Sequence, residues 1–268
     1  MAHKRSHRQD PYALTDDVIA GPPLPGASDV VVTSTADEII DRLAADIVAQ
    51  AIECVRSFGD FHLALSGGRT PEPLYERLMY DPNFRVLPWR RTHLWIVDER
   101  PVDFSHPDSN FRMIRETIVD HADIPQEQVH PMFAQSPTAA VDYEAELRDQ
   151  LVWREKGQDR LDFILLGVGS DGHTASLFPF SEAIHEDTRL VRMNRGGQTP
   201  EGGRLTMTYP LINAARCIAV LATGPGKRPA IERLLATERE SVDALPIAGV
   251  EPVGGELRWY LDAAAAGR

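Results

Sequence analysis

The feature that most constrains this fold is a regular alternation of short apolar runs with amphipathic helical patterns over residues 30–268. The apolar runs have the length of buried strands, and the segments between them repeat apolar residues three or four positions apart. This alternation is typical of an α/β fold in which helices cover both faces of a mainly parallel sheet. Because no repeat or interdomain linker interrupts it, we predict a single, modified Rossmann-like domain over residues 30–268.

The individual runs assign the elements. We predict strands at 30–33, 61–65, 93–97, 161–167, 204–209, 217–223 and 257–261, and helices at 36–57, 71–79, 109–121, 137–155 and 227–236. Thr35 and Glu38 have the spacing of a capping box, in which each side chain accepts a hydrogen bond from the other residue's backbone N–H. The first helix is therefore expected to begin at Ala36.

Residues 1–29 show neither periodicity. They contain Pro11, Pro22, Pro23 and Pro25, and no apolar segment of a targeting signal follows their basic start. We predict a flexible leader, and we expect its removal to leave stability and activity nearly unchanged.

Composition narrows the class of partner. Lys and Arg number 28 and Asp and Glu number 40, which gives a net charge of −12. This charge opposes binding to nucleic acid or to an anionic membrane, although a few local cations can hold a small anionic substrate. We predict a small-molecule substrate, no nucleic-acid partner and no membrane partner. A monomer and a small homo-oligomer both fit the sequence.

Cysteine usage and hydropathy indicate a location. Cys54 and Cys217 lie far apart in apolar runs, which predicts buried thiols in a reducing compartment rather than a disulfide or a metal site. No run reaches the roughly 18 apolar residues that span a bilayer. We predict a cytoplasmic protein.

The loop after the 61–65 run has the composition of an anion site. In parallel sheets, ligands bind at the carboxyl ends of the strands. This loop offers two glycines, two hydroxyls and a cation before a proline that begins a helix, in the order Ser66, Gly67, Gly68, Arg69, Thr70 and Pro71. Free N–H groups at such a helix start can cradle a phosphate, although a tight turn that needs glycine explains the loop equally well.

Two further strand ends carry titratable groups. Asp98, Glu99 and Arg100 follow the 93–97 run, where they are either solvated charges or groups that hold substrate. The loop after 161–167 has a G-x-G-x-x-G spacing, but Asp171 would point a carboxylate at a dinucleotide's pyrophosphate. The same loop instead presents Asp171 and His173 as an acid–base pair.

The loop after 217–223 does not form a nucleotide P-loop. A P-loop needs glycine at 221 and Ser or Thr at 228, where this chain has Leu221 and Arg228. Lys227 can still meet a phosphate, or it can be a solvated helix-start lysine. The sequence also lacks H-E-x-x-H, a clustered metal set and G-x-S-x-G. These residues predict acid–base chemistry on a phosphorylated small molecule.

Several ordered blocks resemble the 6-phosphogluconolactonase family, relatives of the glucosamine-6-phosphate isomerases. The resemblance covers essentially all of residues 30–268, and its blocks are LALSGGRTPEPLYERL, WIVDERPVDFSHPDSNFR, LLGVGSDGHTASLFP, GRLTMT, GPGK, LPIAGV and LRWYLD. It implies hydrolysis of 6-phosphoglucono-δ-lactone to 6-phosphogluconate, the second step of the oxidative pentose phosphate pathway, without cofactor or metal.

The resemblance also implies roles for particular residues. His173 would be the base that activates water, and Asp171 would help to shape the site. Asp98 and Arg100 would line the substrate, with Arg100 as a partner for the developing oxyanion. The Ser66–Thr70 loop, Arg204 and Lys227 would hold the phosphate.

The stretch at 194–201 departs from the family pattern. The family usually has an acidic residue and a Lys-Pro-Pro run shortly before the arginine that corresponds to Arg204, and this chain reads NRGGQTPE there. Either Arg195 and Glu201 substitute from a shifted loop, or turnover is weakened.

Two other functions compete with lactone hydrolysis. The related aminosugar-phosphate deaminases carry a glutamate five residues after the histidine, where this chain has Phe178. That residue cannot assist ring opening. A non-catalytic sugar-phosphate sensor would be favoured by the altered 194–201 stretch, but the intact His173 weighs against it.

Overall fold

The main sheet of this protein is mainly parallel, as the sequence predicts. The computed structural model describes residues 19–152, 155 and 157–268. Eight strands pair in the order β1 (Ile19–Ala20), β2 (Asp29–Thr33), β11 (Glu256–Asp262), β10 (Cys217–Ala222), β7 (Phe163–Gly167), β3 (Phe61–Leu65), β4 (Thr92–Ile96) and β6 (Val129–His130). All neighbours are parallel except β1, which pairs antiparallel with β2. The predicted α/β class with a mainly parallel sheet is confirmed.

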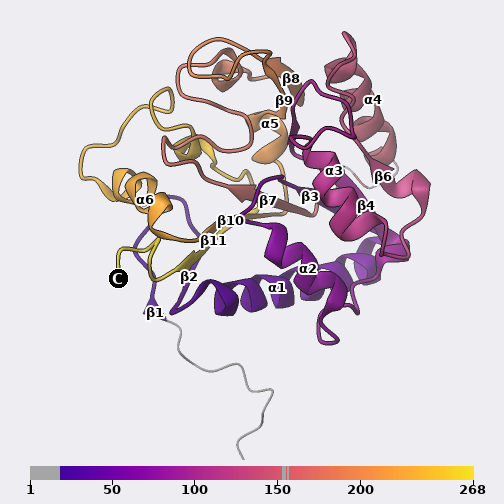
Figure 1. Cartoon of the computed structure of the whole chain (residues 1–268), viewed down its shortest axis with the longest axis horizontal. Coiled ribbons are helices and arrows are strands. Elements are labelled where there is room, and N and C mark those ends of the chain that lie inside the picture. The colour runs from indigo at the N-terminus through magenta and orange to yellow at the C-terminus, as the bar shows by residue number, and fades with distance from the viewer. Residues whose placement is uncertain (1–18, 153–154, 156) are drawn as a thin grey trace, which may run out of the picture.

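Helices lie on both sides of this sheet. They are α1 (Ala36–Phe58), α2 (Glu72–Tyr80), α3 (Asn110–Ile114), α4 (Ala139–Leu151), α5 (Tyr209–Ile212) and α6 (Arg228–Leu235). In Figure 1, α1 and α2 run below the sheet, and α5 lies above it together with a second, smaller sheet. One continuous cluster of buried apolar residues joins the layers, from Leu24 to Ala265.

Helix α1 shows how local sequence sets an element. The Thr35 side chain accepts from the Glu38 N–H and the Glu38 carboxylate accepts from the Thr35 N–H, which confirms the capping box. The helix ends at Gly59, whose positive φ of 95° closes the last turn. Between these caps it buries a stripe that includes Ile39, Leu43 and Ile47.

Two of the predicted helices differ from their expected form. The 109–121 helix is α3 followed by a π-helical turn at Arg115–Val119. The 137–155 helix is α4, which ends at Leu151, and residues 153, 154 and 156 lie outside the described part of the chain.

The smaller sheet was not expected. It contains β5 (Asp98–Glu99), β9 (Arg204–Met207) and β8 (Val191–Asn194), all paired antiparallel. The 204–209 run is therefore a strand, but it pairs with Asp98 and Glu99 instead of extending the main sheet. An apolar run predicts a strand and not its partner, because pairing is a non-local property.

The predicted leader boundary is wrong by about ten residues. Residues 19–29 were expected to be flexible, yet Ile19 and Ala20 pair with Val32 and Val31. Leu24 is only 5% exposed, and the Ser28 N–H donates to the Leu257 carbonyl at 2.7 Å. Prolines are compatible with such an edge segment because it makes few ladder hydrogen bonds. The remainder of the leader, residues 1–18, lies outside the described residues.

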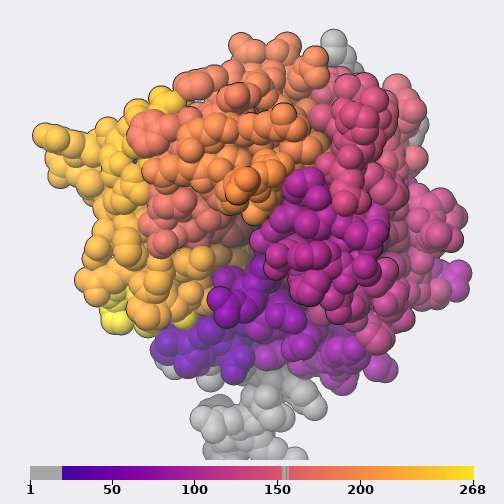
Figure 2. Space-filling view, turned by 45° about the horizontal axis from the view of Figure 1, so that its top comes forward, coloured from indigo at the N-terminus to yellow at the C-terminus, as the bar shows by residue number. Residues whose placement is uncertain are grey.

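The topology places the chemistry-bearing loops side by side. Strands β10, β7, β3 and β4 are consecutive in the sheet, and the four loops singled out in the sequence follow their carboxyl ends. Figure 2 shows the surface hollowed where the purple segments after β3 and β4 meet the orange C-terminal segments. Within the described residues, no helix has the length and apolar character needed to cross a membrane.

Candidate active site

The centre of the candidate site is a hydrogen-bonded imidazole and carboxylate. His173 Nδ1 lies 2.6 Å from Asp171 Oδ1, and the His173 backbone N–H donates to the same oxygen at 3.1 Å. Because an ionised carboxylate only accepts, the shared proton lies on Nδ1, which leaves a lone pair on Nε2. Both side chains are about one-third exposed, so solvent or substrate can reach them.

The turn that carries this pair requires its glycines. A Cβ on Gly169 would lie 2.2 Å from His173 Nδ1 and 2.3 Å from Asp171 Oδ1. Gly172 has a φ of +90°, and a Cβ there would lie 2.3 Å from Leu245 Cδ1. The glycine spacing that resembles a dinucleotide loop therefore serves to bring the two side chains together.

The charge of Asp171 is set by its hydrogen bonds. Burial alone would raise the pKa of Asp171, but the hydrogen bonds from the His173 imidazole and backbone N–H outweigh it. The pKa of Asp171 is therefore below its ordinary value. The carboxylate stays ionised at neutral pH and holds the imidazole in one tautomer.

Lys227 lies beside the same turn. Its Nζ donates to the Val168 carbonyl at 2.7 Å, and the charge of Asp171 acts on it. Burial nevertheless lowers the pKa of Lys227 below its ordinary value. A half-buried ammonium with a carbonyl as its hydrogen-bond partner is suited to receive an anionic ligand.

A second group of charges forms at the end of β4. Burial lowers the pKa of Arg204, and the positive charge of Arg100 lowers it further, while Asp98 opposes the shift. The two guanidinium groups are therefore close enough to repel each other. Asp98 itself is 9% exposed, and its Oδ2 accepts from the Ser176 hydroxyl at 2.6 Å. Asp98 thus ties the loop after His173 to the smaller sheet.

Glu99, between these residues, caps a helix. It is fully buried, and its carboxylate accepts from the Ser109 hydroxyl and from the backbone N–H groups of Arg100, Asn110 and Phe111. Burial raises the pKa of Glu99, and these hydrogen bonds only partly offset it. The Glu99 carboxylate therefore fixes the start of α3.

The glycine loop after β3 is arranged differently from the expectation for Ser66. The Ser66 hydroxyl donates to the Leu165 carbonyl at 2.8 Å, so its proton is committed to β7 and is not offered to a phosphate. Gly68 and Arg69 are exposed, and with Arg100 they line an open cleft of about 560 Å³. Thr70 is half-buried just before α2.

The expected residues thus form two groups. Asp171, His173 and Lys227 surround the turn after β7, whereas Asp98, Arg100 and Arg204 gather at the ends of β4 and β5 together with Gly67, Gly68 and Arg69. No contact within the described residues joins Lys227 to Arg204. The Ser176–Asp98 hydrogen bond links the two groups.

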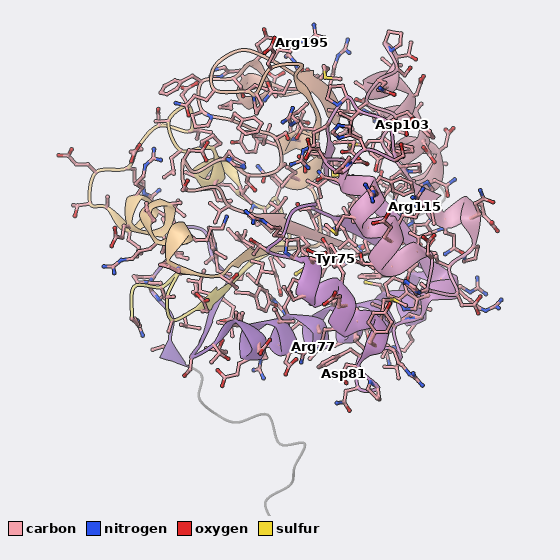
Figure 3. The ribbon with its side chains drawn as sticks, in the orientation of Figure 1. Tyr75, Arg77, Asp81, Asp103, Arg115 and Arg195 are labelled. Carbon is pink, nitrogen blue, oxygen red and sulfur yellow. The ribbon has the colours of Figure 1, made fainter. Side chains whose placement is uncertain are left out.

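Two charged residues of the altered 194–201 stretch lie at the protein surface. Asn194 is fully buried, where it binds Ser176 and Ala183, but Arg195 and Glu201 are exposed. In Figure 3, Arg195 lies at the upper edge of the molecule, far from Tyr75, whose hydroxyl binds the Ser66 carbonyl. Arg195 Cγ would lie 3.3 Å from a Cβ on Gly203, the residue before Arg204. That Arg195 and Glu201 substitute from a shifted loop stays a prediction.

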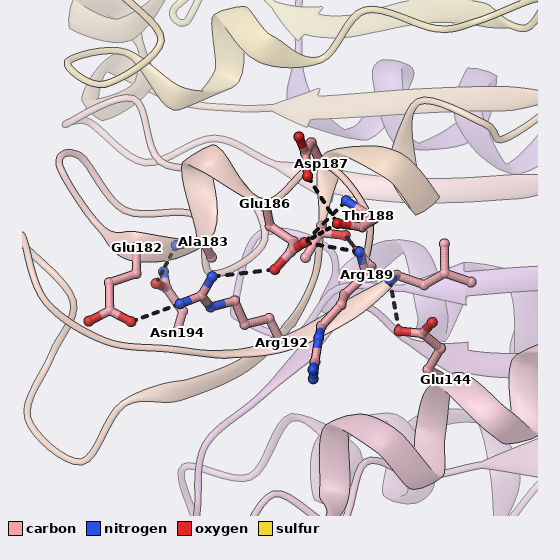
Figure 4. A network of polar contacts seen from close by, with 11 residues as sticks. Glu144, Glu182, Ala183, Glu186, Asp187, Thr188, Arg189, Arg192 and Asn194 are labelled. Carbon is pink, nitrogen blue, oxygen red and sulfur yellow. Dashed lines mark hydrogen bonds and ion pairs between the residues drawn. The ribbon is translucent and has the colours of Figure 1, made fainter.

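Charge pairs hold the segment that precedes this stretch. Arg192 bridges Glu182 at 3.0 Å and Glu186 at 3.3 Å, and Glu144 on α4 accepts from the Leu190 N–H (Figure 4). These contacts fix β8 against its neighbours, while most residues of 195–202 are exposed.

Three polar residues of the site were not identified from the sequence. Asn110 and Ser176 bind Asp98, and Arg233 donates to the Asp171 carbonyl at 2.7 Å. Asn110 and Ser176 lie in blocks that carry the family resemblance, but their roles depend on partners distant in sequence. Arg233 lies in α6, and the sequence of that helix contains no motif that marks Arg233 as a site residue.

One group among the described residues could hold a metal ion. Candidate ligand atoms of Asp60, His62 and His93 lie within 4.8 Å of one another, at the amino ends of β3 and β4. The Trp95 indole N–H donates to His62 Nδ1 at 3.0 Å, so the His62 proton lies on Nε2, 3.4 Å from Asp60. A metal ligand needs a lone pair at that nitrogen, so the arrangement favours a hydrogen bond.

Fold and site together define an α/β protein with an acid–base pair and several cations at the carboxyl edge of its sheet. Such an edge suits an enzyme that transfers protons on a small anionic substrate. The chain belongs to the family of glucosamine-6-phosphate isomerases and 6-phosphogluconolactonases, whose sequence profile matches residues 34–259.

Similar proteins support this assignment. A 6-phosphogluconolactonase of Synechocystis is 40% identical over 232 residues, which are 84% of this chain and 91% of that protein. The human GDH/6PGL endoplasmic bifunctional protein is 39% identical over 235 residues, which are 87% of this chain and only 29% of that protein. The chain therefore spans less than a third of that relative. The crystal structure of 6-phosphogluconolactonase from Thermotoga maritima has a TM-score of 0.74 at 28% identity, covering 87% of this chain and 99% of that chain.

Proposed function

We propose that this protein hydrolyses 6-phosphoglucono-δ-lactone to 6-phosphogluconate in the oxidative pentose phosphate pathway. The observation that carries the proposal is the 2.6 Å contact between His173 Nδ1 and Asp171, which leaves Nε2 as a base. Two relatives that are named 6-phosphogluconolactonase, and that this chain matches over most of their own length, support the choice of substrate.

The reaction follows from this tautomer. His173 Nε2 accepts a proton from water as the water oxygen bonds to the lactone carbonyl carbon. The imidazolium that forms is stabilised by Asp171. The tetrahedral intermediate then collapses, the ring C–O bond breaks, and the proton on Nε2 passes to the departing ring oxygen. The products are a hydroxyl group and a carboxylic acid, which ionises.

The cations of the site would bind the charged groups of the substrate. The Arg100 guanidinium is the candidate partner for charge that develops on the carbonyl oxygen. Arg204 and Lys227, with N–H groups of the Gly67–Thr70 loop, would bind the phosphate. Burial and the charge of Arg100 lower the pKa of Arg204, and a phosphate bound to Arg204 would offset that cost.

Neither competing function has a supporting contact. Phe178, at the deaminase acid position, places its ring 4.7 Å from the His173 ring and carries no titratable group. A sensor would not need the tautomer that Asp171 fixes.

We further propose that the enzyme works in the cytoplasm without metal or cofactor, as one domain from residue 19 onward. The buried positions of Cys54 and Cys217 support a reducing compartment, and burial raises the pKa of Cys217 to about 12.

The test uses lactone generated freshly from glucose 6-phosphate, because the lactone also hydrolyses spontaneously. Decay is compared with and without the protein, and with added EDTA. We expect acceleration that EDTA does not change, and no ammonia from glucosamine 6-phosphate. Saturable binding of 6-phosphogluconate without acceleration would contradict the proposal and support a sensor.

A further inference from the structure

Asn110, the first residue of α3, contacts Asp98, Arg100 and the glycine loop after β3. It is 3% exposed. Its side-chain Nδ2 donates to the Asp98 carbonyl at 2.6 Å, and its Oδ1 accepts from the Arg100 guanidinium. The backbone of Gly67 packs against the same amide, because a Cβ on Gly67 would lie 1.8 Å from Oδ1.

The orientation of this amide is determined by its partners. The Asp98 carbonyl can only accept a hydrogen bond, and a guanidinium can only donate. The Asn110 nitrogen must therefore face Asp98 and its oxygen must face Arg100, and the flipped amide would lose both contacts.

Arg100 needs such an acceptor. The positive charge of Arg100 acts on the nearby Arg204 and, with burial, lowers the pKa of Arg204. Without a ligand between them, the two groups repel, and the Asn110 oxygen is a neutral acceptor that holds Arg100 in place without cancelling its charge. A carboxylate at this position would accept from Arg100 but would neutralise its charge, and it could not donate to the Asp98 carbonyl.

We propose that Asn110 is a positioning residue that sets the Arg100 guanidinium relative to the glycine loop, and so determines how the substrate's anionic groups are held. The inference rests on the proposed function, because Arg100 is the group that would touch the substrate. Asn110 itself acts only through Arg100. Its place at the start of α3, where Glu99 accepts from its backbone N–H at 2.8 Å, makes this position rigid.

A double-mutant cycle tests the inference. Asn110→Ala and Arg100→Met are each compared with the wild type and with the double variant, by kcat/KM for the lactone. A misplaced group commonly costs about 10²-fold, so we expect a loss of about 10- to 100-fold for Asn110→Ala. The double variant should be no worse than Arg100→Met alone. Losses that multiply in the double variant, or wild-type kinetics for Asn110→Ala, would overturn the inference.

Two further variants separate positioning from folding. Ser109→Ala removes neighbouring hydrogen bonds to Glu99 and to the Arg112 N–H without touching Arg100, so it should lower Tm but keep kcat/KM within twofold. Asn110→Asp keeps the shape and the acceptor for Arg100, but it loses the donor to the Asp98 carbonyl and neutralises Arg100, so it should weaken 6-phosphogluconate binding at least tenfold. Calorimetric titration with 6-phosphogluconate measures this without turnover.

The two proposals fail in different ways. If wild-type protein binds 6-phosphogluconate but does not accelerate lactone decay, the proposed function fails. The positioning role then stands or falls on whether Asn110→Ala and Asn110→Asp weaken that binding. If the wild type is active and Asn110→Asp binds and turns over like the wild type, the inference about Asn110 fails and the proposed function stands.

Discussion

At the scale of single residues, the proposed activity depends on which nitrogen of His173 carries the proton. Asp171 fixes that proton on Nδ1, and the imidazole can then act as a base. We expect His173→Ala to lower kcat by about 10²- to 10⁴-fold with an unchanged Tm. His185→Ala is the matched control, since His185 is an exposed histidine paired with Asp243. Wild-type kcat in His173→Ala would remove the residue from the mechanism.

Asp171 predicts the form of the pH profile. With wild-type protein, kcat falls on the acid side as the imidazole becomes protonated. In Asp171→Asn the imidazolium loses its stabilising charge, so kcat should fall. The pKa of Asp171 is below 3.8 in the folded state, so the stability it contributes is present above pH 3.8 and is lost as pH falls through the folded value. Wild-type kcat in Asp171→Asn would contradict the pairing.

Lys227 predicts opposite effects on binding and on stability. Burial lowers its pKa, so the folded state bears a cost for the charge at neutral pH. Lys227→Met should therefore leave Tm unchanged or raise it, while KM rises by the equivalent of about 1.5–3 kcal/mol if the ammonium binds phosphate. Arg228→Met, which breaks only the exposed pair with Glu232, should not change KM. Equal activity of the wild type on unphosphorylated gluconolactone would count against a phosphate role.

Residue identity alone predicts part of this site. Asp171 and His173 are two positions apart on one turn, so their contact is local and could be read from the sequence. The commitment of the Ser66 hydroxyl to Leu165, and that of Asp98 to Ser176, depend on which strands become neighbours. Such contacts between distant segments explain why Ser66 was assigned to phosphate and why Asn110 was not identified.

At the scale of elements, the sequence predicts strands and helices better than their partners. The runs at 61–65 and 217–223 are β3 and β10 nearly to the residue, because central parallel strands are continuous apolar runs. β5 is a two-residue strand of charged residues, and its polar sequence gives no strand signal. The smaller sheet therefore could not be predicted.

The start of α3 offers a test at this scale. The Glu99 carboxylate accepts from both Ser109 and Phe111 through Oε2, and an amide nitrogen there would face two donors. Glu99→Gln should lower the free energy of unfolding at pH 7 by about 1–3 kcal/mol, the cost of unsatisfied buried groups. The control Glu116→Gln breaks only an exposed pair with Arg112 and should cost under about 1 kcal/mol. Denaturant melts that do not separate the two variants would contradict the capping role.

At the scale of the whole molecule, the amino-terminal segment is part of the folded sheet. β1 adds an antiparallel edge to β2, and Leu24 is buried within the common core. The low hydrophobicity of residues 1–29 concealed this, because one buried leucine and a two-residue strand do not alter the composition of a proline-rich stretch. The edge also covers β2, whose N–H and C=O groups would otherwise be open to another chain.

Deletion of the segment measures what it contributes. Two truncations, one of residues 1–18 and one of residues 1–28, are compared by thermal and denaturant unfolding. The longer truncation also removes the β1 pairing, the burial of Leu24 and both hydrogen bonds between Ser28 and Leu257.

Burying one leucine contributes about 1.5–3 kcal/mol, so the longer truncation should be less stable by at least that amount and should melt several degrees lower. The kcat/KM of the longer truncation should stay near that of the shorter one, because β1 is the edge strand and several strands separate it from β7 and β3. Equal melting temperatures would show that residues 19–28 form no stabilising contact and would restore the boundary at Val30.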